Sequence, residues 1–210
     1  HLCAVYPHEP DFRQRLRVRN NGFGGCQEMA LRDSIAWGKR NCDYILHTGD
    51  LIDWPSEANF DLARKYMGEK GLFGCLGNHE FYRDGVFGPQ DEATRQKSIP
   101  TLQRSFAFDI VLHSQVINGV NFVTLDNVFG TVNAGQVERF MKEAEKGLPI
   151  VLCCHVPFYT DLLWIAHEKS ERCGNCRERA IIFDAGQVPD AWGDRERALG
   201  DVRRDHVRAV

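Results

Sequence analysis

The sequence contains no long apolar run and no strong excess of charge of either sign. No hydrophobic stretch approaches the roughly 18 residues that a membrane span needs, so we expect no membrane crossing within this segment. The 26 Lys and Arg residues against 29 Asp and Glu give a formal net charge of −3, which argues against nucleic acid as the main partner. Repeats and low-complexity tracts are absent, which excludes fibrous and disordered classes. The 210 residues can bury one core as a single domain.

Cysteine is plentiful, with eight residues, but the pattern does not suggest a disulfide framework. Cys75 and the adjacent pair Cys153 and Cys154 lie in apolar, strand-like runs, where neighbouring residues face opposite ways and cannot readily pair. This pattern favours a reducing compartment over export, so we expect a cytoplasmic location. Cys173 and Cys176 form one C-x-x-C, typical of a loop with free thiols or a local disulfide; the alternative is a zinc site completed by a nearby His.

Hydrophobic periodicity predicts alternating helices and strands, which indicates an α/β architecture. Asn118 and Gly119 predict a hairpin turn inside an alternating segment, residues 106–126. Ser56 is the expected N-cap of a helix over residues 57–69. The remaining expected strands are 44–48, 71–76, 149–154 and, more weakly, 180–183, and the remaining expected helices are 27–40, 137–144 and 194–209.

Polar side chains follow three of the expected strands at the point where each strand ends. In open α/β sheets, ligands bind beyond the carboxyl ends of strands, so these distant segments can converge on one site. Carboxylate, amide and imidazole groups together suit divalent Mn, Fe or Zn. The competing motifs G-x-S-x-G, P-loop and G-x-G-x-x-G are absent. The candidate site residues are Asp50, Asp53, Asn78, His79, Glu80 and His155.

Two of these segments carry a family resemblance. Residues 49–53 read G-D-L-I-D and residues 77–80 read G-N-H-E, which resemble the GDxxD and GNHE blocks of calcineurin-like metallophosphoesterases. His155 resembles the single His that follows the next core strand of that family. The resemblance implies a four-layer α/β/β/α sandwich of two mixed sheets flanked by helices.

Two blocks of the family pattern are missing. His1 fits the His of an opening DxH block, and the chain's last helical segment resembles the one that leads into a closing GHxH block. We therefore expect residues 1–210 to form a single metallophosphoesterase domain trimmed at both edges, which holds metal poorly without the missing ligands.

The resemblance also implies a set of metal ligands. Asp50 would bridge two divalent ions, Asn78 and His155 would complete the second ion, and His1 would help to hold the first. Two such ions lower the pKa of a bridging water, and the resulting hydroxide attacks phosphorus. The implied activity is hydrolysis of phosphomonoesters or phosphodiesters, with a small phosphorylated molecule as the substrate.

The resemblance gives the neighbouring residues other roles. His79 would protonate the leaving oxygen or stabilise the transition state without being a ligand. Asp53 would orient His79 and raise its pKa, and Glu80 would hydrogen-bond a ligand or the backbone.

Several interpretations stay open. A non-catalytic binding domain of the same fold and a nuclease of the same superfamily are the alternatives to the phosphoesterase. The alternating Arg13, Arg15, Arg17 and Arg19 indicate either a solvated strand or loop face, or a loop that contacts phosphate. The aromatic residues that follow the metal blocks either line a substrate pocket or pack in the core; they are Tyr82, Phe87, Phe158, Tyr159 and Trp164.

Overall fold

The computed structural model describes residues 1–9, 12–68, 71–81 and 90–158 and has an α/β fold. Five helices accompany two small sheets in this part of the chain. The helices are α1 (Arg13–Phe23), α2 (Gln27–Asn41), α3 (Glu57–Met67), α4 (Glu92–Leu102) and α5 (Ala134–Ala144). The strands are β1 (Ile45–Thr48), β2 (Leu72–Cys75), β3 (Leu112–Ile117), β4 (Val120–Leu125) and β5 (Ile150–Cys153), and short 3-10 turns are η2 (Asn78–Phe81), η3 (Gln103–Ser105) and η4 (Val128–Gly130).

The two sheets differ in their pairing. β1 and β2 are parallel, with Ile45 opposite Leu72 and Thr48 opposite Cys75. In the second sheet, β4 lies between β3, which is antiparallel to it, and β5, which is parallel to it. Parallel pairing brings the carboxyl ends of β1 and β2 to one edge, and the loops that leave this edge carry the polar residues singled out in the sequence.

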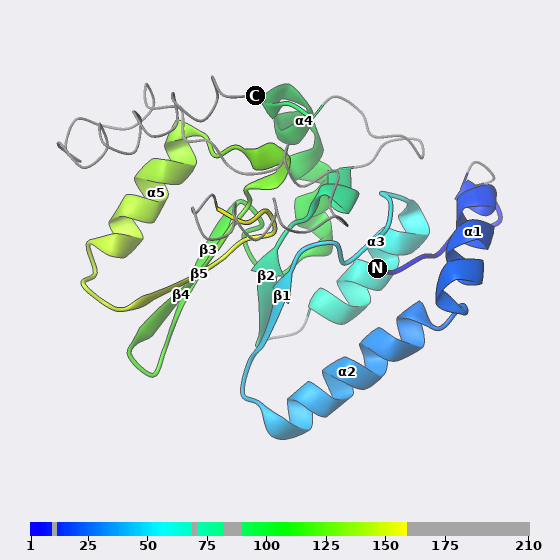
Figure 1. The fold of residues 1–210 in the computed structure, drawn as a ribbon, viewed down its shortest axis with the longest axis horizontal. Coiled ribbons are helices and arrows are strands. Elements are labelled where there is room, and N and C mark those ends of the chain that lie inside the picture. Colours follow the sequence, from blue (N-terminus) through cyan, green and yellow to red (C-terminus); the bar gives the residue numbers. More distant parts are fainter. Residues whose placement is uncertain (10–11, 69–70, 82–89, 159–210) are drawn as a thin grey trace, which may run out of the picture.

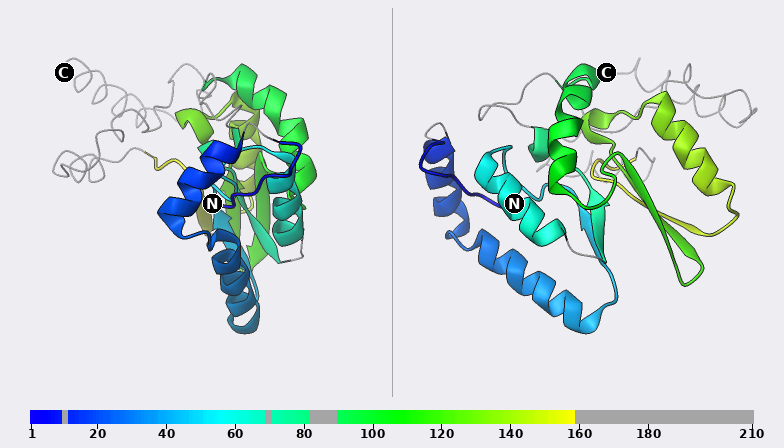
Figure 2. Two further views of the ribbon diagram at one scale, coloured as in Figure 1. Left: turned by 90° about the vertical axis from the view of Figure 1, so that its right-hand side faces the viewer. Right: turned by 180° about the vertical axis from the view of Figure 1, so that it is seen from behind.

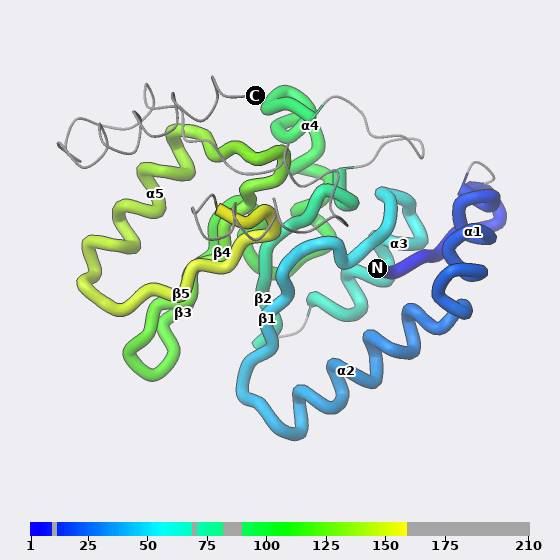
Figure 3. The backbone as a smooth tube through the Cα atoms, in the orientation of Figure 1, coloured from blue at the N-terminus to red at the C-terminus, as the bar shows by residue number. Residues whose placement is uncertain are grey.

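The sheets lie in the middle of the molecule with helices on both flanks (Figure 1). Helix α5 lies beside the three-stranded sheet, and α1, α2 and α3 lie on the side of β1 (Figures 1 and 2). The backbone tube shows the N-terminal segment running outward past α3 to α1, after which α2 leads back to β1 (Figure 3). A short parallel bridge between Leu2 and Ile52 fixes the start of the chain beside the loop after β1.

Most of the expected elements are present at nearly the expected positions. Ser56 caps α3, because its hydroxyl accepts a hydrogen bond from the Asn59 backbone N–H at 3.2 Å. Asn118 and Gly119 form the turn between β3 and β4, with φ angles of 51° and 80°. Both angles lie in the left-handed region, as the two central residues of a type I′ hairpin turn require. The α/β class with two sheets is confirmed, whereas a four-layer arrangement stays a prediction.

The arginine-rich segment is a helix, so the expectation of a strand or loop there was wrong. Residues Arg13–Phe23 form α1, which places Arg15 and Arg19 one turn apart on one face. Helix α4 was not predicted either. Its apolar residues have no regular helical spacing and it contains Pro100, but Asp91 caps it by accepting from the Thr94 backbone N–H at 2.8 Å.

Other expectations fall outside the described residues. These are the strand over 180–183, the helix over 194–209, the C-x-x-C at Cys173 and Cys176, and the aromatic residues Tyr82, Phe87, Tyr159 and Trp164. Phe158 is described and packs against a small core cluster of Leu112, Val123 and Leu125. None of the described helices combines the length and the apolar character needed to span a membrane.

Candidate metal centre

The loop after β1 and the loop after β2 are in direct contact. Gly49 and Asp50 follow β1 with φ angles of 95° and 58°, which turn the chain sharply and aim the Asp50 carboxylate across the sheet edge. Asp50 Oδ1 accepts a hydrogen bond from the His79 backbone N–H at 3.0 Å. Gly77 leaves the space for this approach, since a Cβ there would collide with the Asp50 side chain and backbone. Glycine at position 77 is therefore a steric requirement of the loop pairing.

Glu80 connects the same two loops through hydrogen bonds to their backbone. Its buried carboxylate accepts from the backbone N–H groups of Gly77 at 2.7 Å, Asp50 at 3.1 Å and Ile52 at 3.1 Å. Burial, together with the charge of Asp50, raises the pKa of Glu80 to about 7 in spite of these three donors. Of the two roles expected for Glu80, a hydrogen bond to a ligand or to the backbone, these contacts show the second.

His155 reaches the site from the loop after β5. Its Nδ1 lies 2.9 Å from the Thr48 carbonyl oxygen, which can only accept, so Nδ1 carries the hydrogen and Nε2 presents its lone pair. Nε2 then lies 3.2 Å from Asn78 Oδ1 and 3.4 Å from Asp50 Oδ2. Three electron-pair donors thus face one another, an arrangement that needs a proton or a cation between them.

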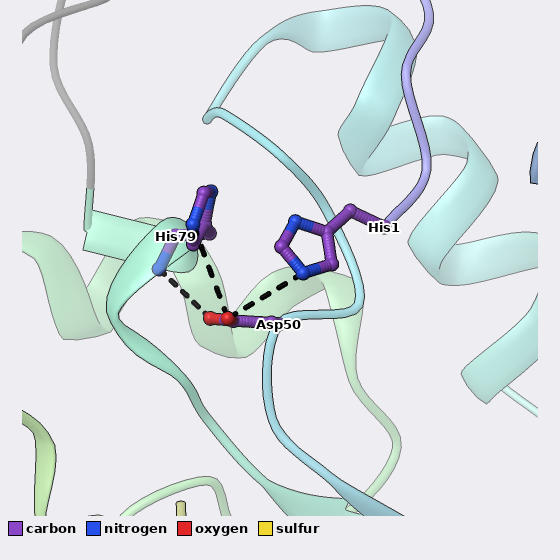
Figure 4. A group of neighbouring side chains, drawn as sticks. All are labelled: His1, Asp50 and His79. Carbon is purple, nitrogen blue, oxygen red and sulfur yellow. Dashed lines mark hydrogen bonds and ion pairs between the residues drawn. The ribbon is translucent and has the colours of Figure 1, made fainter. Parts of the chain in front are cut away.

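His1 and His79 approach Asp50 from the other side. His1 Nε2 lies 3.5 Å and His79 Nε2 lies 4.0 Å from Asp50 Oδ2, and both imidazoles point toward this carboxylate (Figure 4). One ligand atom from each of His1, Asp50 and His79 lies within 4.8 Å of the others. By geometry alone, His79 could therefore also contact a metal ion, a role that the sequence did not assign to it.

Asp53 lies behind the two imidazoles and is fully buried. Its Oδ1 lies 2.9 Å from His79 Nδ1 and 3.2 Å from His1 Nδ1, and its Oδ2 accepts from the guanidinium groups of Arg15 and Arg19. Burial raises the pKa of Asp53, but these four hydrogen bonds outweigh it and hold the pKa far below the usual range. The hydrogen bond to Asp53 in turn raises the pKa of His1.

The residues present fit divalent cations. Both His155 and His1 have a hydrogen-bonded Nδ1, to Thr48 and Asp53 respectively, and such a partner orients a ligating imidazole and directs its Nε2 to the metal. The donor set of imidazole nitrogen, carboxylate and amide oxygen around Asp50 Oδ2 suits Mn, Fe or Zn. The Nε2 atoms of His155 and His1 lie 3.4 and 3.5 Å from Oδ2, which is long for a hydrogen bond but suitable for two ligands of one ion.

Some residues around the site could not be recognised from the sequence. Asn127, fully buried after β4, donates to the Val156 carbonyl at 2.6 Å and accepts from the Val156 N–H at 3.0 Å, which fixes the loop that carries His155. His47 accepts from the Gly49 N–H at 3.2 Å and supports the turn before Asp50. Burial lowers the pKa of His47 to about 4. The contact of His47 spans only two positions, whereas Asn127 acts on a residue 29 positions away, which no local pattern marks.

Comparison with known proteins supports the resemblance seen in the sequence. A search among curated proteins found no match. The family model described as calcineurin-like phosphoesterase matches residues 26–187, which include Asp50, Asn78, His79 and His155. His1 lies before the matched range. Members of this family generally hydrolyse phosphoesters with the help of divalent metal ions. Because the match covers most of the chain, the chain belongs to the calcineurin-like phosphoesterase family.

Proposed function

We propose that the protein is a hydrolase of phosphate esters that depends on two divalent metal ions, Mn, Fe or Zn. The observation that carries the proposal is the approach of three imidazole Nε2 atoms to one carboxylate oxygen, Asp50 Oδ2, at 3.4 to 4.0 Å. Two of these nitrogens, from His1 and His155, suit ligands of divalent cations together with the oxygen, and the third, from His79, lies within reach of the same site. The family to which the chain belongs supports the reaction class.

Within this proposal, Asp50 would be a ligand of both ions. Asn78 and His155 would hold one ion, and His1 would hold the other. The remaining ligands of the family pattern, an Asp of a DxH block and the histidines of a GHxH block, would complete the set. A carboxylate suits the shared position because its two oxygens can serve two cations at once.

When bound, the two ions supply positive charge that lowers the pKa of water and neutralises charge on a phosphoryl group. The chain's own residues do the rest. Asp53 accepts from His79 Nδ1 at 2.9 Å and so turns His79 Nε2 toward the substrate side of Asp50. From there His79 donates a proton to the leaving oxygen, or stabilises the charge that develops on it. Glu80 holds the loops of Asp50 and Asn78 together through backbone N–H groups.

The proposed substrate is a small phosphorylated molecule, either a monoester or a diester. A nucleic-acid substrate would call for free basic groups around the site, but two of the arginines suspected in the sequence, Arg15 and Arg19, are paired with Asp53. A cytoplasmic location is also part of the proposal and is based on the cysteine pattern. The non-catalytic alternative predicts a folded chain in which metal binding brings no hydrolysis.

The test is hydrolysis of p-nitrophenyl phosphate and of bis(p-nitrophenyl) phosphate by the full-length protein loaded with Mn, Fe or Zn. We expect turnover that disappears with a chelator, returns with metal and is lost in Asp50→Ala. Cleavage of only one of the two compounds assigns the enzyme to monoesters or diesters. Stoichiometric metal binding without turnover of either compound would favour the non-catalytic binding domain.

A further inference from the structure

Two arginines of α1 donate hydrogen bonds to Oδ2 of Asp53, whereas His1 and His79 contact Oδ1. Arg15 Nε lies 3.0 Å and Arg19 Nε lies 2.8 Å from Asp53 Oδ2. Arg15 also donates through Nη2 to the Asp53 carbonyl oxygen at 3.1 Å, and its guanidinium stands 5.3 Å from the ring centre of the buried Trp54. Residues four apart share one helix face, so both contacts come from the same side of α1.

Core packing does not account for the position of α1. None of its residues is buried, and its N-cap residue, Phe12, makes no capping hydrogen bond through its side chain. Helices in globular proteins are usually stabilised by an apolar face packed on the core. Here Arg15 and Arg19 connect the helix to a single buried carboxylate, that of Asp53, behind the candidate metal centre.

The carboxylate itself needs these partners. Asp53 is fully buried, and a buried charge is costly unless it is paired and hydrogen-bonded. The imidazoles of His1 and His79 occupy Oδ1, so a permanently charged partner that balances the carboxylate has to reach it at Oδ2. Two guanidinium groups supply that balance, and charge-assisted hydrogen bonds of this kind are the strong ones.

We propose that Arg15 and Arg19 are positioning residues of the metal centre. They fix Oδ2 of Asp53 so that Oδ1 stays on the Nδ1 atoms of His79 and His1, and they do not bind the substrate phosphate. The kinetic part of this inference rests on the proposed function, whereas its structural part does not. Removing both guanidinium groups lets the Asp53 carboxylate rotate away. His79 then loses its charged partner, and its Nδ1 stays within 3.1 Å of the Asp53 carbonyl oxygen, which holds the ring less firmly.

The first experiment follows the ring of His79 by NMR in the ¹⁵N-labelled chain. We expect a slowly exchanging Nδ1–H resonance of His79 in the unaltered protein and in Arg17→Gln, which removes the same charge from an exposed position of α1. The resonance should broaden or vanish in Arg15→Gln/Arg19→Gln, and Lys at both positions should restore it in part. An unchanged His79 resonance in the folded double Gln variant would overturn the inference.

Folding is checked by circular dichroism, and the single variants Arg15→Gln and Arg19→Gln replace the double variant if it does not fold. In that case the same loss of the His79 resonance in either folded single variant supports the inference. An intact resonance in both would overturn it.

The second experiment measures kinetics in the full-length, metal-loaded protein. We expect Arg15→Gln/Arg19→Gln to lower kcat by about 10–100-fold with an unchanged KM and unchanged metal content, as for other residues that orient a site from behind. Arg17→Gln should keep both constants. A higher KM with an unchanged kcat would mean that the guanidinium groups bind the phosphate, against the inference. If the unaltered protein hydrolyses no phosphoester, the proposed function fails, and the NMR result alone decides the positioning role.

Discussion

Asp53 Oδ1 lies 2.9 Å from His79 Nδ1, and this contact turns the opposite nitrogen of the imidazole toward Asp50. The carboxylate therefore determines that Nε2, and not Nδ1, is the ring nitrogen of His79 that is available for chemistry. His79 also lies next to Asn78, a proposed metal ligand, so its own role can be separated from metal binding only by experiment.

Replacing His79 with Ala should keep the metal content and lower kcat by about 10²–10⁴-fold, the usual contribution of a positioned acid. The measurement pairs metal analysis with steady-state kinetics in the full-length protein. Because a good leaving group needs little protonation, the defect should be smaller on p-nitrophenyl phosphate than on an alkyl phosphate. Asp53→Asn should also keep the metal, with a smaller loss of kcat.

Two results would change this assignment. Equal losses on both substrates would mean that His79 stabilises the phosphoryl oxygens and is not the acid. A loss of metal in His79→Ala would make His79 a ligand, a role that the 4.8 Å cluster of His1, Asp50 and His79 allows geometrically.

Replacing Asn127 with Ala should weaken both the fold and the metal centre. The change removes two hydrogen bonds to Val156 and leaves a buried carbonyl and N–H unpaired, which costs about 2–4 kcal/mol of unfolding free energy. The loop that carries His155 then loses its anchor, so the affinity for Mn²⁺ should fall as well. Urea unfolding and Mn²⁺ titration measure the two effects.

Asn133→Ala is the matched control for that experiment. Asn133 caps α5 by accepting from the Gln136 backbone N–H at 3.0 Å, and losing such a cap costs about 1 kcal/mol. The control should therefore destabilise the protein without changing its Mn²⁺ affinity. Equal Mn²⁺ affinities of the two variants would show that Asn127 has no special effect on His155.

The metal-free chain should lose stability as the pH falls from about 6.5 to about 4, partly because of His47. Burial lowers its pKa to about 4, below the ordinary 6.5, so its contribution to stability is present above pH 6.5 and is lost on acidification through this window. The maximum effect is about 3 kcal/mol, at 1.36 kcal/mol per pKa unit between 6.5 and about 4. Urea unfolding at several pH values should give a shallower slope for His47→Gln. Identical slopes would contradict a half-buried His47 that stays neutral.

The sequence allowed the loops of the site to be predicted because each polar residue follows a short apolar strand. Asp50 and Asn78 end two parallel strands, so their meeting follows from topology. The arginine segment was misjudged because Arg at every second position imitates a strand, although the chain there forms α1. Contacts such as Arg19 to Asp53 and Asn127 to Val156 join residues 34 and 29 positions apart, and no local pattern encodes them.

The most direct test of the metal centre is a Mn²⁺ titration of the full-length protein by calorimetry, with Asp50→Ala, His155→Ala and the exposed control Asp33→Ala. The account predicts Mn²⁺ binding in the unaltered chain and in Asp33→Ala, weaker binding in His155→Ala and none in Asp50→Ala, since Asp50 Oδ2 is the atom that the histidine nitrogens surround. Binding of Mn²⁺ to Asp50→Ala with unchanged affinity and stoichiometry would contradict it.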